Sequence, residues 1–476
     1  MKIKLSFKLI ITTILILLQY SVSAGDKDKV YFTNGFKIGE VTQNSVVILT
    51  RLCKAEFPVP IQHKQKEAPF CSPIDFDNDM EVSKMDGHVA GTFGRVRITL
   101  ISEKDTLKGD WTHVSSYEDY TFKQQIGGLL PNTKYDVLIE GRKNFKSPKT
   151  SIKGSFTTSP MDHQIVPVTF TSTSCQYFWD YDHPERGFNT YDAMAKLNPQ
   201  FHCQTGDFVY YDKPGPMSYN IELARHKWGA INGWPSIRDF YANVPLYLEK
   251  DDHDMLKDDA TPKIKPLGEF TFYDGLKVWR ENAPLYGTPY RTFRWGQDLQ
   301  IWLIEGREFR SENKSPDSPE KTILGKEQIA WLKETVKNSD ATFKVLLSPT
   351  PIVGPDRVKG KTDNHANASF KTEGEWLRKF LGENTIYVVN GDRHWQYVSE
   401  DQETGLLEFS QGATSDNHAQ GWKQEDVRPE HKFLRVKGGF VAVNVFRENN
   451  IPTIEFVHFD CKGNEVNKEV IKYKSL

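Results

Sequence analysis

The sequence lacks a charge bias. Its 61 basic residues nearly balance 63 acidic residues, which leaves a formal net charge of −2 at pH 7. A protein that binds nucleic acid usually carries an excess of lysine and arginine on one face, so no nucleic-acid partner is predicted. Internal repeats and low-complexity segments are also absent, which excludes a repeat architecture. With 476 residues, 38% of them hydrophobic, the chain is predicted to fold as a globular protein with two domains.

Long apolar runs are scarce, and the one that stands out is N-terminal. The basic stretch "MKIKLSFK" precedes the apolar "LIITTILILL", and "VSA" ends at Ala24. This three-part pattern is typical of a secretory signal peptide, here residues 1–24. The apolar run is short for a membrane span. We therefore expect a periplasmic or secreted protein that starts near Gly25, has no membrane span after cleavage and is a monomer.

Cysteine is scarce too. The five residues are Cys53, Cys71, Cys175, Cys203 and Cys461. Export permits disulfides, and because Cys53 and Cys71 bracket a short loop, they are the expected pair. The odd count leaves at least one thiol without an intramolecular partner. A disulfide between Cys175 and Cys203 stays open as an alternative to a metal-binding role for Cys175.

Two patterns divide the remaining chain. Residues 28–160 alternate apolar and polar side chains between turn residues, which predicts an antiparallel β-sandwich with Tyr135 as its corner tyrosine. Residues 166–476 alternate short apolar strands with helical stretches, which predicts an α/β domain. Two aromatic-rich inserts, roughly 212–243 and 260–292, are predicted to form walls around a site or simply the core of the inserts.

Four predicted strands of the second part end in groups that bind metals. They are "VPVTFTSTSC" ending at Cys175, "FHCQTGD" at Asp207, "VPLYLEKDD" at Asp251 and Asp252, and "TIYVVNGD" at Asp392, with His394 close behind. Ligands of α/β proteins bind at the carboxyl ends of strands, so these groups converge if the strands share a sheet. So much charge cannot be buried without cations. Each residue alone also has an ordinary structural explanation, but together they predict a multi-metal centre.

The motifs "SCQ", "GDFVYY", "DDHD" and "GDRHW" follow one another in an order and spacing that resembles the PhoD-like alkaline phosphatases, within the calcineurin-like metallophosphoesterases. The stretch "YFTNGFKIGEVTQNSVVILTRL" is similar to the sandwich domain that precedes the catalytic domain in that family. The resemblance implies an α/β fold, a four-layer α/β/β/α metallophosphoesterase sandwich, with an N-terminal fibronectin-like β-sandwich domain.

The resemblance also implies roles for individual residues. Cys175 and Tyr210 would bind a ferric ion as thiolate and phenolate, and Asp207 would bridge two cations. The full set of implied metal ligands is Cys175, Asp207, Tyr210, Asp252, Asp392 and His394, for one Fe(III) and one or two Ca(II). Such ions lower the pKa of bound water, so a metal-bound hydroxide or oxide could attack phosphorus. His253 would then protonate the leaving oxygen.

Several roles stay open. Arg307 could hold a substrate oxyanion as a second catalytic residue, or pair with Glu305 or Glu308. Tyr210 could simply pack. The residues Asp254, Asp258 and Asp259 are expected to support ligands or face solvent, and Asn364 and His365 either reach the mouth of the site or make turns.

The predicted function is an exported metal-dependent hydrolase of phosphate mono- or diesters. Sulfate and phosphate esters are both tetrahedral oxyanions, so a sulfate-ester hydrolase that acts on a polysaccharide is one alternative. The other is a non-enzymatic surface protein whose acidic loops bind calcium.

Overall fold

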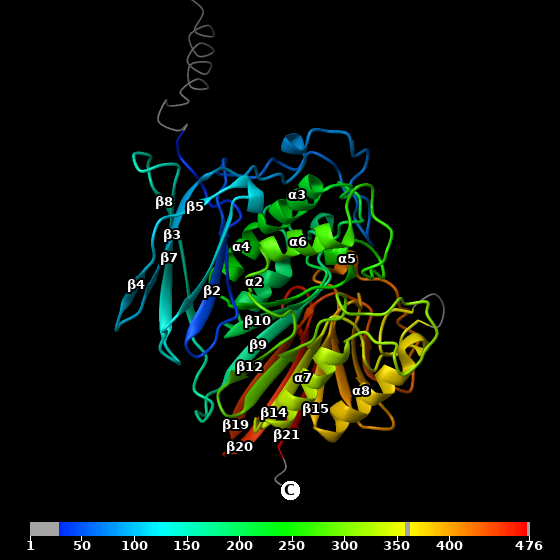
Figure 1. Ribbon diagram of the computed structural model, residues 1–476. Helices are drawn as coiled ribbons and strands as arrows, with labels where there is room; N and C mark the ends of the chain where they lie inside the picture. Colours follow the sequence, from blue (N-terminus) through cyan, green and yellow to red (C-terminus); the bar gives the residue numbers. More distant parts are fainter. Residues whose placement is uncertain (1–27, 358–361, 474–476) are drawn as a thin grey trace, which may run out of the picture.

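The computed structural model describes residues 28–357 and 362–473. The predicted signal peptide, residues 1–24, lies outside the described residues. The fold is a mixed α/β arrangement with several sheets (Figure 1). In the described ranges the strands form a nine-stranded sheet of order β21-β20-β19-β9-β10-β11-β1-β2-β6, a seven-stranded sheet of order β12-β13-β14-β15-β17-β16-β18, and a five-stranded sheet of order β4-β3-β7-β8 in which β5 also pairs with β3.

The first eight strands come from the part of the chain that alternates apolar and polar residues. They are β1 (Phe36–Gly39), β2 (Ser45–Arg51), β3 (Gly94–Ile101), β4 (Thr106–Lys108), β5 (Thr112–Val114), β6 (Thr121–Gly127), β7 (Lys134–Arg142) and β8 (Thr150–Thr157). In β3 and β7, alternate residues such as Val96, Ile98, Val137 and Ile139 are buried. The alternation places one face of each strand on the core, as the period of a β-strand requires.

The later strands belong to the α/β part. They are β9 (Val168–Thr173), β10 (Phe201–Thr205), β11 (Leu246–Glu249), β12 (Arg291–Trp295), β13 (Leu299–Leu303), β14 (Phe343–Ser348), β15 (Ile386–Asn390), β16 (Gln396–Glu400), β17 (Leu407–Gln411), β18 (His431–Arg435), β19 (Phe440–Glu448), β20 (Ile451–Phe459) and β21 (Glu465–Lys472). The pairs β9–β10, β10–β11, β13–β14 and β14–β15 are parallel.

Helices cover the outer faces of the two larger sheets. They are α2 (Asn189–Ala195), α3 (Ile221–Asn232), α4 (Pro235–Tyr241), α5 (Asp252–Met255), α6 (Phe272–Asn282), α7 (Lys326–Lys337) and α8 (Lys371–Glu383). The group from α2 to α6 shares one apolar cluster with β11 and β19. Helices α7 and α8 share another with β13, β14 and β15, and Figure 1 shows these two helices together beside those strands.

The main core lies between the two larger sheets. Phe170 and Phe201 of the nine-stranded sheet face Ile301, Val345 and other residues of the seven-stranded sheet in one apolar cluster. The same cluster continues into the N-terminal strands. Burying this contiguous apolar surface is the main favourable contribution to stability.

Hydrogen bonding crosses the predicted domain boundary. Strand β1 pairs in parallel with β11 at Gly39 and Leu246, so three N-terminal strands extend the sheet that carries β9, β10 and β11. Packing is close at this junction: a Cβ added to Gly154 would lie 1.8 Å from the carbonyl oxygen of Ala242. The division into residues 28–160 and 166–476 stays a prediction, and the structure shows that the two parts are firmly joined.

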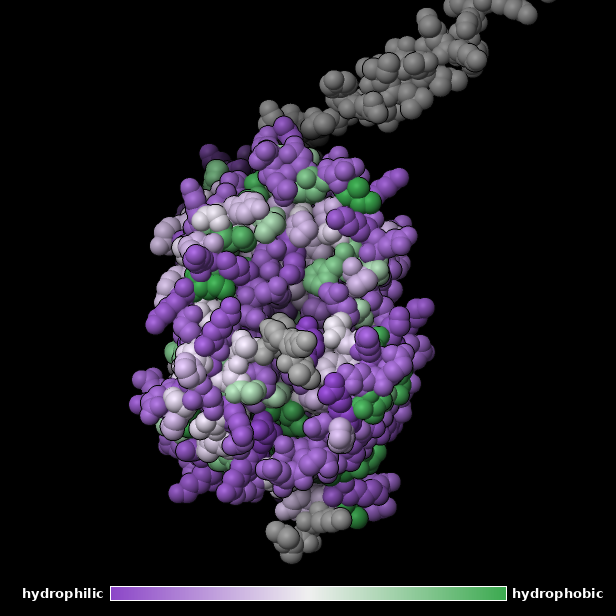
Figure 2. Space-filling model, turned by 90° about the vertical axis from the view of Figure 1, so that its right-hand side faces the viewer, coloured by the Kyte–Doolittle hydropathy of each residue, from purple (hydrophilic) through white to green (hydrophobic). Residues whose placement is uncertain are grey.

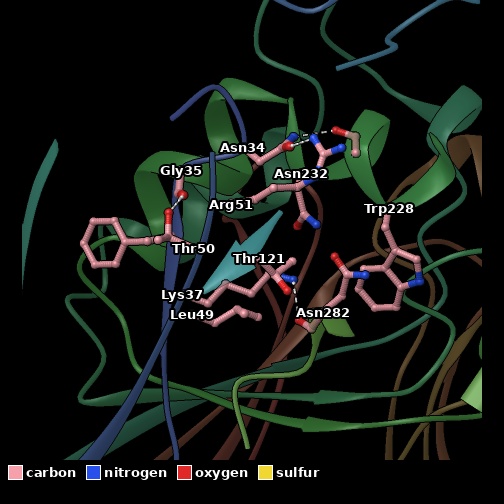
Figure 3. A pocket seen from close by; sticks show the side chains of 12 residues that line it. Asn34, Gly35, Lys37, Leu49, Thr50, Arg51, Thr121, Trp228, Asn232 and Asn282 are labelled. Atoms are coloured by element: carbon pink, nitrogen blue, oxygen red, sulfur yellow. Dashed lines mark hydrogen bonds between the residues drawn. The ribbon is translucent and has the colours of Figure 1, made fainter. Parts of the chain in front are cut away.

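A narrow cavity lies between the N-terminal strands and helices α3 and α6. Figure 3 shows Lys37 of β1, Trp228 of α3 and Asn282 of α6 around it. The Nζ of Lys37 lies 4.4 Å from the ring centroid of Phe208 and 3.4 Å from the carbonyl oxygen of Asn282. The cavity holds about 20 Å³, enough for a water molecule but too little for an ester substrate.

The aromatic residues of the first insert form core. Trp228 is fully buried and Trp234 is 7% exposed, and both belong to the apolar cluster beneath α3 and α4. A role in stacking on sugar rings is therefore not supported for them.

On the face shown in Figure 2, hydrophobic residues lie in small groups among hydrophilic ones. Within residues 28–357 and 362–473, no helix has the length and apolar character of a membrane span.

The expected disulfide between Cys53 and Cys71 is wrong. All five cysteines are free and buried. Cys53 lies between the backbones of Tyr31 and Gly91, whereas the Cys71 backbone N–H donates to the carboxylate of Asp180 at 2.5 Å. The chain between them leads away from the N-terminal strands toward the α/β part. Cys175 and Cys203 are not paired either, so the thiol of Cys175 is available to a metal.

The corner tyrosine gives a test of the N-terminal fold. The Tyr135 hydroxyl accepts a hydrogen bond of 2.9 Å from the backbone N–H of Leu130, as expected for this corner. We expect Tyr135→Phe to lower the free energy of unfolding by about 1 to 2 kcal/mol, because it leaves that N–H without its acceptor. Urea unfolding measures the change. Tyr473→Phe, at a residue that is 49% exposed, is the control; an equal loss in both variants would contradict the assignment.

Candidate metal centre

The predicted strand ends do converge, but from two sheets. Strands β9, β10 and β11 are adjacent and parallel, so Cys175, Asp207 and Asp252 follow neighbouring strand ends. Strand β15, which leads to His394, belongs to the seven-stranded sheet. The four strands therefore do not share one sheet, which was the condition under which convergence was expected. The two sheets meet at this edge, where a Cβ on Gly391 would lie 2.6 Å from the Thr205 carbonyl oxygen.

The backbone at these strand ends is unusual. Cys175, Asp207 and Asp392 have φ angles of 56°, 56° and 61°, in the left-handed region that residues other than glycine seldom occupy. Strained conformations of this kind concentrate at functional sites. Gly206 precedes Asp207 with φ +98°, and a Cβ there would lie 2.6 Å from the Cβ of Asp251. The glycine of this "GD" motif is required by close approach of two strand ends.

Four side chains form the most compact group. The Cys175 Sγ is 3.5 Å from Asp207 Oδ2, and the Tyr210 hydroxyl is 3.0 Å from the same oxygen. Possible ligand atoms of Cys175, Asp207 and His394 all lie within 4.8 Å of one another. Cys175 and Asp207 are buried, and Tyr210 is 2% exposed. Tyr210 therefore does more than pack, because its oxygen points into the group.

Burial governs the protonation of this group. It raises the pKa of Cys175, Asp207 and Tyr210 well above their ordinary values, and the neighbouring acidic groups add to the shift. Burial and nearby cationic groups lower the pKa of His394 well below its ordinary value, so its imidazole is neutral and able to bind a metal. Among the described residues, Asp207 Oδ1 is a buried oxygen with no hydrogen-bond donor. A cation among these donors would compensate the charge.

A second group centres on Asp252 and His253, which open helix α5. Asp207, Asp252 and His253 have ligand atoms within 4.8 Å of one another. The His253 Nδ1 lies 2.7 Å from Asp212 Oδ1, and its Nε2 lies 3.1 Å from Asp258. Burial alone would lower the pKa of His253, but Asp212, Asp252 and Asp207 outweigh it and hold the pKa well above its ordinary value. The contacts with Asp212 and Asp258 hold the His253 ring in a fixed orientation.

The guanidinium of Arg307 pairs with neither of the glutamates considered for it, although the Arg307 backbone N–H donates to Glu305 at 2.7 Å. Its Nε donates to Asp251 Oδ1 at 2.5 Å, and both side chains are fully buried. Its Nη2 is 3.9 Å from Asp252 and 3.6 Å from Asp363. The glutamates instead bind Lys250: its Nζ lies 3.2 Å from Glu305 and 2.9 Å from Glu308.

The other aspartates of "KDDHDMLKDD" have distinct positions. Asp254 is buried, and its carboxylate accepts hydrogen bonds from the backbone N–H groups of Asp207, Val209 and Asp251 at 2.7, 3.0 and 3.0 Å. It thereby fixes the loop that carries Asp207. Asp259 joins Asp252 and Asp363 in a third group with ligand atoms within 4.8 Å. Asp258 is largely exposed and reaches His253.

Of the two roles considered for Asn364 and His365, their contacts fit the local one. Asn364 donates to Asp356 at 2.8 Å, and His365 lies 2.8 Å from Glu373, so both serve the loop. Their neighbour Asp363 is the residue that reaches the acidic group. Asp392 lies outside the groups that the described residues form, and its Oδ2 is 2.8 Å from Arg393 Nη1.

Four residues of the site were not found from the sequence. All four lie in loops or short 3-10 turns rather than directly at a strand end: Asp180, Asp212, Asp363 and His418. Asp212 was detectable in principle, because it follows "GDFVYY" directly. His418 carries no such signal, although its Nε2 lies 2.9 Å from the Tyr210 hydroxyl and 3.2 Å from His394 Nε2.

Comparison with known sequences agrees with this geometry. The model of the PhoD-like phosphatase family matches residues 170–438, more than half of the chain and every strand end described above. The chain belongs to the PhoD-like phosphatases. Alkaline phosphatase D of Bacillus subtilis (strain 168) is 24% identical over 334 residues, which are 58% of this chain and 53% of the relative. The chain thus spans about half the length of that curated relative.

Solved structures share the fold. The structure of PhoD matches with a TM-score of 0.71 and 18% identity, over 93% of this chain and 90% of that one. A purple acid phosphatase, PPD1 from yellow lupin seeds, matches with a TM-score of 0.59 and 10% identity, over 94% and 74% of the two chains. At these identities the likeness concerns the fold, which this PhoD-like phosphatase shares over nearly its whole described length.

The strand-end glycine can be tested directly. We expect Gly206→Ala to destabilise the protein by at least about 2 kcal/mol, because the new methyl group overlaps Asp251 and must displace a strand end. Gly287→Ala is the matched control: φ is +84° there, but nothing lies within 4 Å of the added Cβ. Thermal unfolding of both variants separates contact from backbone strain. Equal losses would show that strain alone requires glycine at position 206.

Proposed function

We propose that the protein is an exported, metal-dependent phosphoesterase that hydrolyses phosphate mono- or diesters. The observation that carries the proposal is the buried group of Cys175, Asp207, Tyr210 and His394 beside Asp252 and His253, in a chain of the PhoD-like phosphatase family. Export is supported by the signal-peptide pattern of residues 1–24. The packing of two sheets between helices supports the four-layer α/β/β/α arrangement, and the strands of residues 28–160 support an N-terminal β-sandwich domain.

The donors fit two kinds of cation. Phenolate and carboxylate suit a hard, highly charged ion, and imidazole and thiolate also bind iron, so Cys175, Asp207, Tyr210 and His394 would hold Fe(III). Oxygen donors alone suit Ca(II), and Asp252, Asp259 and Asp363 would provide them. Asp207 belongs to the group of Cys175 and His394 and also to the group of Asp252 and His253, which supports a bridging role between the two cations. Asp392, beside Arg393, would complete the set of ligands proposed from the sequence.

The bound cations would polarise the phosphoryl oxygen and lower the pKa of a bound water. His253 acts on the other side of the scissile bond. Asp212 holds the ring through Nδ1, and Nε2, which lies beside the exposed Asp258, would give a proton to the leaving oxygen. Asp254 holds the backbone of Asp207 in place during the reaction.

Arg307 lies against the buried carboxylates of Asp251, Asp252 and Asp363. Its guanidinium is fully buried and bonded to Asp251, so it balances the negative charge of Asp251, Asp252 and Asp363. This position supports a role in orienting Asp252 more than direct contact with a substrate oxyanion. Leaving such buried carboxylates without a cationic partner is strongly unfavourable.

Metal dependence provides the first functional test. We expect Asp207→Asn to reduce bound metal and to lower hydrolysis of p-nitrophenyl phosphate or bis-p-nitrophenyl phosphate at least about 100-fold, since the proposed bridging charge is lost. Metal analysis and a panel of phosphomono-, phosphodi- and sulfate esters measure this. Asp136→Asn, at an exposed strand position, is the control. Calcium without turnover of any ester would refute the enzyme, and turnover of sulfate esters alone would refute the phosphoesterase.

The proposed proton donor provides the second test. We expect His253→Gln to slow esters with poor leaving groups by about 100-fold or more, because an alkoxide needs a proton as it departs. Esters with good leaving groups, such as p-nitrophenolate, should slow far less. Initial rates across a series of leaving groups measure the difference. Equal slowing across the series would exclude His253 as the acid.

A further inference from the structure

His418 is a buried histidine that reaches the metal centre from a separate loop. It ends the short turn Asp416–His418, after strand β17, and it is fully buried. Its Nε2 lies 2.9 Å from the Tyr210 hydroxyl and 3.2 Å from His394 Nε2. Two residues proposed as metal ligands therefore contact one nitrogen of this ring.

Asp180 holds the opposite side of the His418 ring. Its Oδ2 lies 2.5 Å from His418 Nδ1, and both side chains are fully buried. A carboxylate accepts hydrogen bonds, so Nδ1 carries a hydrogen and the ring cannot turn without breaking this contact. The other oxygen of Asp180 accepts the backbone N–H of Cys71 at 2.5 Å. The carboxylate–histidine arrangement is the one that orients groups around metals in proteins.

Phe70, in the N-terminal part of the chain, also contacts His418. The Phe70 ring centroid lies 4.3 Å from that of His418, and the Phe70 backbone N–H donates to the carbonyl oxygen of Asn417 at 2.9 Å. Phe70 is itself in a left-handed conformation with φ 60°, which is rare for a bulky residue. The His418 ring is thus fixed by a hydrogen-bonded carboxylate, an aromatic ring and a backbone hydrogen bond.

We propose that His418, oriented by Asp180, is a positioning residue: its Nε2 accepts the hydrogen of the Tyr210 phenol, takes that proton when the oxygen binds a cation, and then donates it in a hydrogen bond that holds the tyrosinate oxygen in place. The Tyr210 oxygen otherwise contacts Asp207 Oδ2 from one side at 3.0 Å, and His418 fixes it from the other. The inference rests on the proposed metal centre, because positioning Tyr210 matters only if its oxygen binds an ion. It adds Asp180 and His418 to the residues on which metal affinity depends.

The test compares three variants of the full mature chain. His418→Leu removes the nitrogen, His418→Gln keeps a polar nitrogen near the same point, and His458→Leu removes another fully buried histidine, whose Nε2 binds the Ser410 carbonyl oxygen far along strand β20. Each protein is loaded with Fe(III) and dialysed against increasing chelator. The readouts are retained iron and the wavelength of the tyrosinate-to-iron absorption band, which a purely structural role would not shift.

We expect His418→Leu to lose iron at about 10- to 100-fold lower chelator concentration and to shift the band. His418→Gln should recover most of the affinity, and His458→Leu should keep the wild-type band. If His418→Leu does not fold, Asp180→Asn is measured instead and should show the same band shift. An unchanged band and iron affinity in a folded His418→Leu or Asp180→Asn protein would overturn the inference. A wild-type protein that binds no metal would overturn the proposed centre itself, and the inference with it.

Discussion

Burial of several acidic groups around one point is the constraint on which the rest of the structure depends. Cys175, Asp207 and Tyr210 each have a pKa raised well above the ordinary value by burial. Keeping such groups together is unfavourable unless a cation or a fixed donor balances them. Arg307 balances the buried carboxylate of Asp251, the backbone N–H groups around Asp254 balance another, and the group around Asp207 is the proposed site for cations. The supporting contacts follow from this electrostatic demand.

The need to bring these groups together also accounts for the unusual backbone conformations at the site. Three site residues, Cys175, Asp207 and Asp392, occupy left-handed conformations that cost free energy in an ordinary strand. Each lies just after the end of its strand, near the edge where the two sheets meet. Gly206 and Gly391 allow the strand ends to approach closely enough for this. In each "GD" pair, the glycine allows its strand end to approach a neighbouring strand end. The aspartate that follows lies at the edge where these strand ends meet.

The site residues at strand ends could be predicted from the sequence, whereas those in loops could not. Asp252 and His253 were predictable because they follow a short apolar strand, and parallel strands present their carboxyl ends at one edge. The partition of the strands between two sheets was not predictable, since the apolar pattern of a strand does not show which sheet it joins. Asp180, Asp363 and His418 were missed for a related reason. They come from loops with no periodic pattern, and their positions depend on how the sheets pack. The disulfide prediction failed because a short sequence separation does not imply that two side chains lie close together. Cys71 instead lies beside Asp180, whose carboxylate accepts its backbone N–H.

The contacts of Phe70 and Cys71 change how the N-terminal part should be understood. A domain that merely precedes a catalytic domain would leave the site complete without it. Here strand β1 extends the sheet that carries the strand ends, and the segment around Phe70 packs on His418 and bonds to Asp180 and Asn417. Because Asp180 orients His418 and His418 contacts Tyr210, the effect of this segment passes through two hydrogen bonds to a proposed metal ligand. The N-terminal part is therefore structurally continuous with the site, and removing it would expose the buried groups whose balance the site requires.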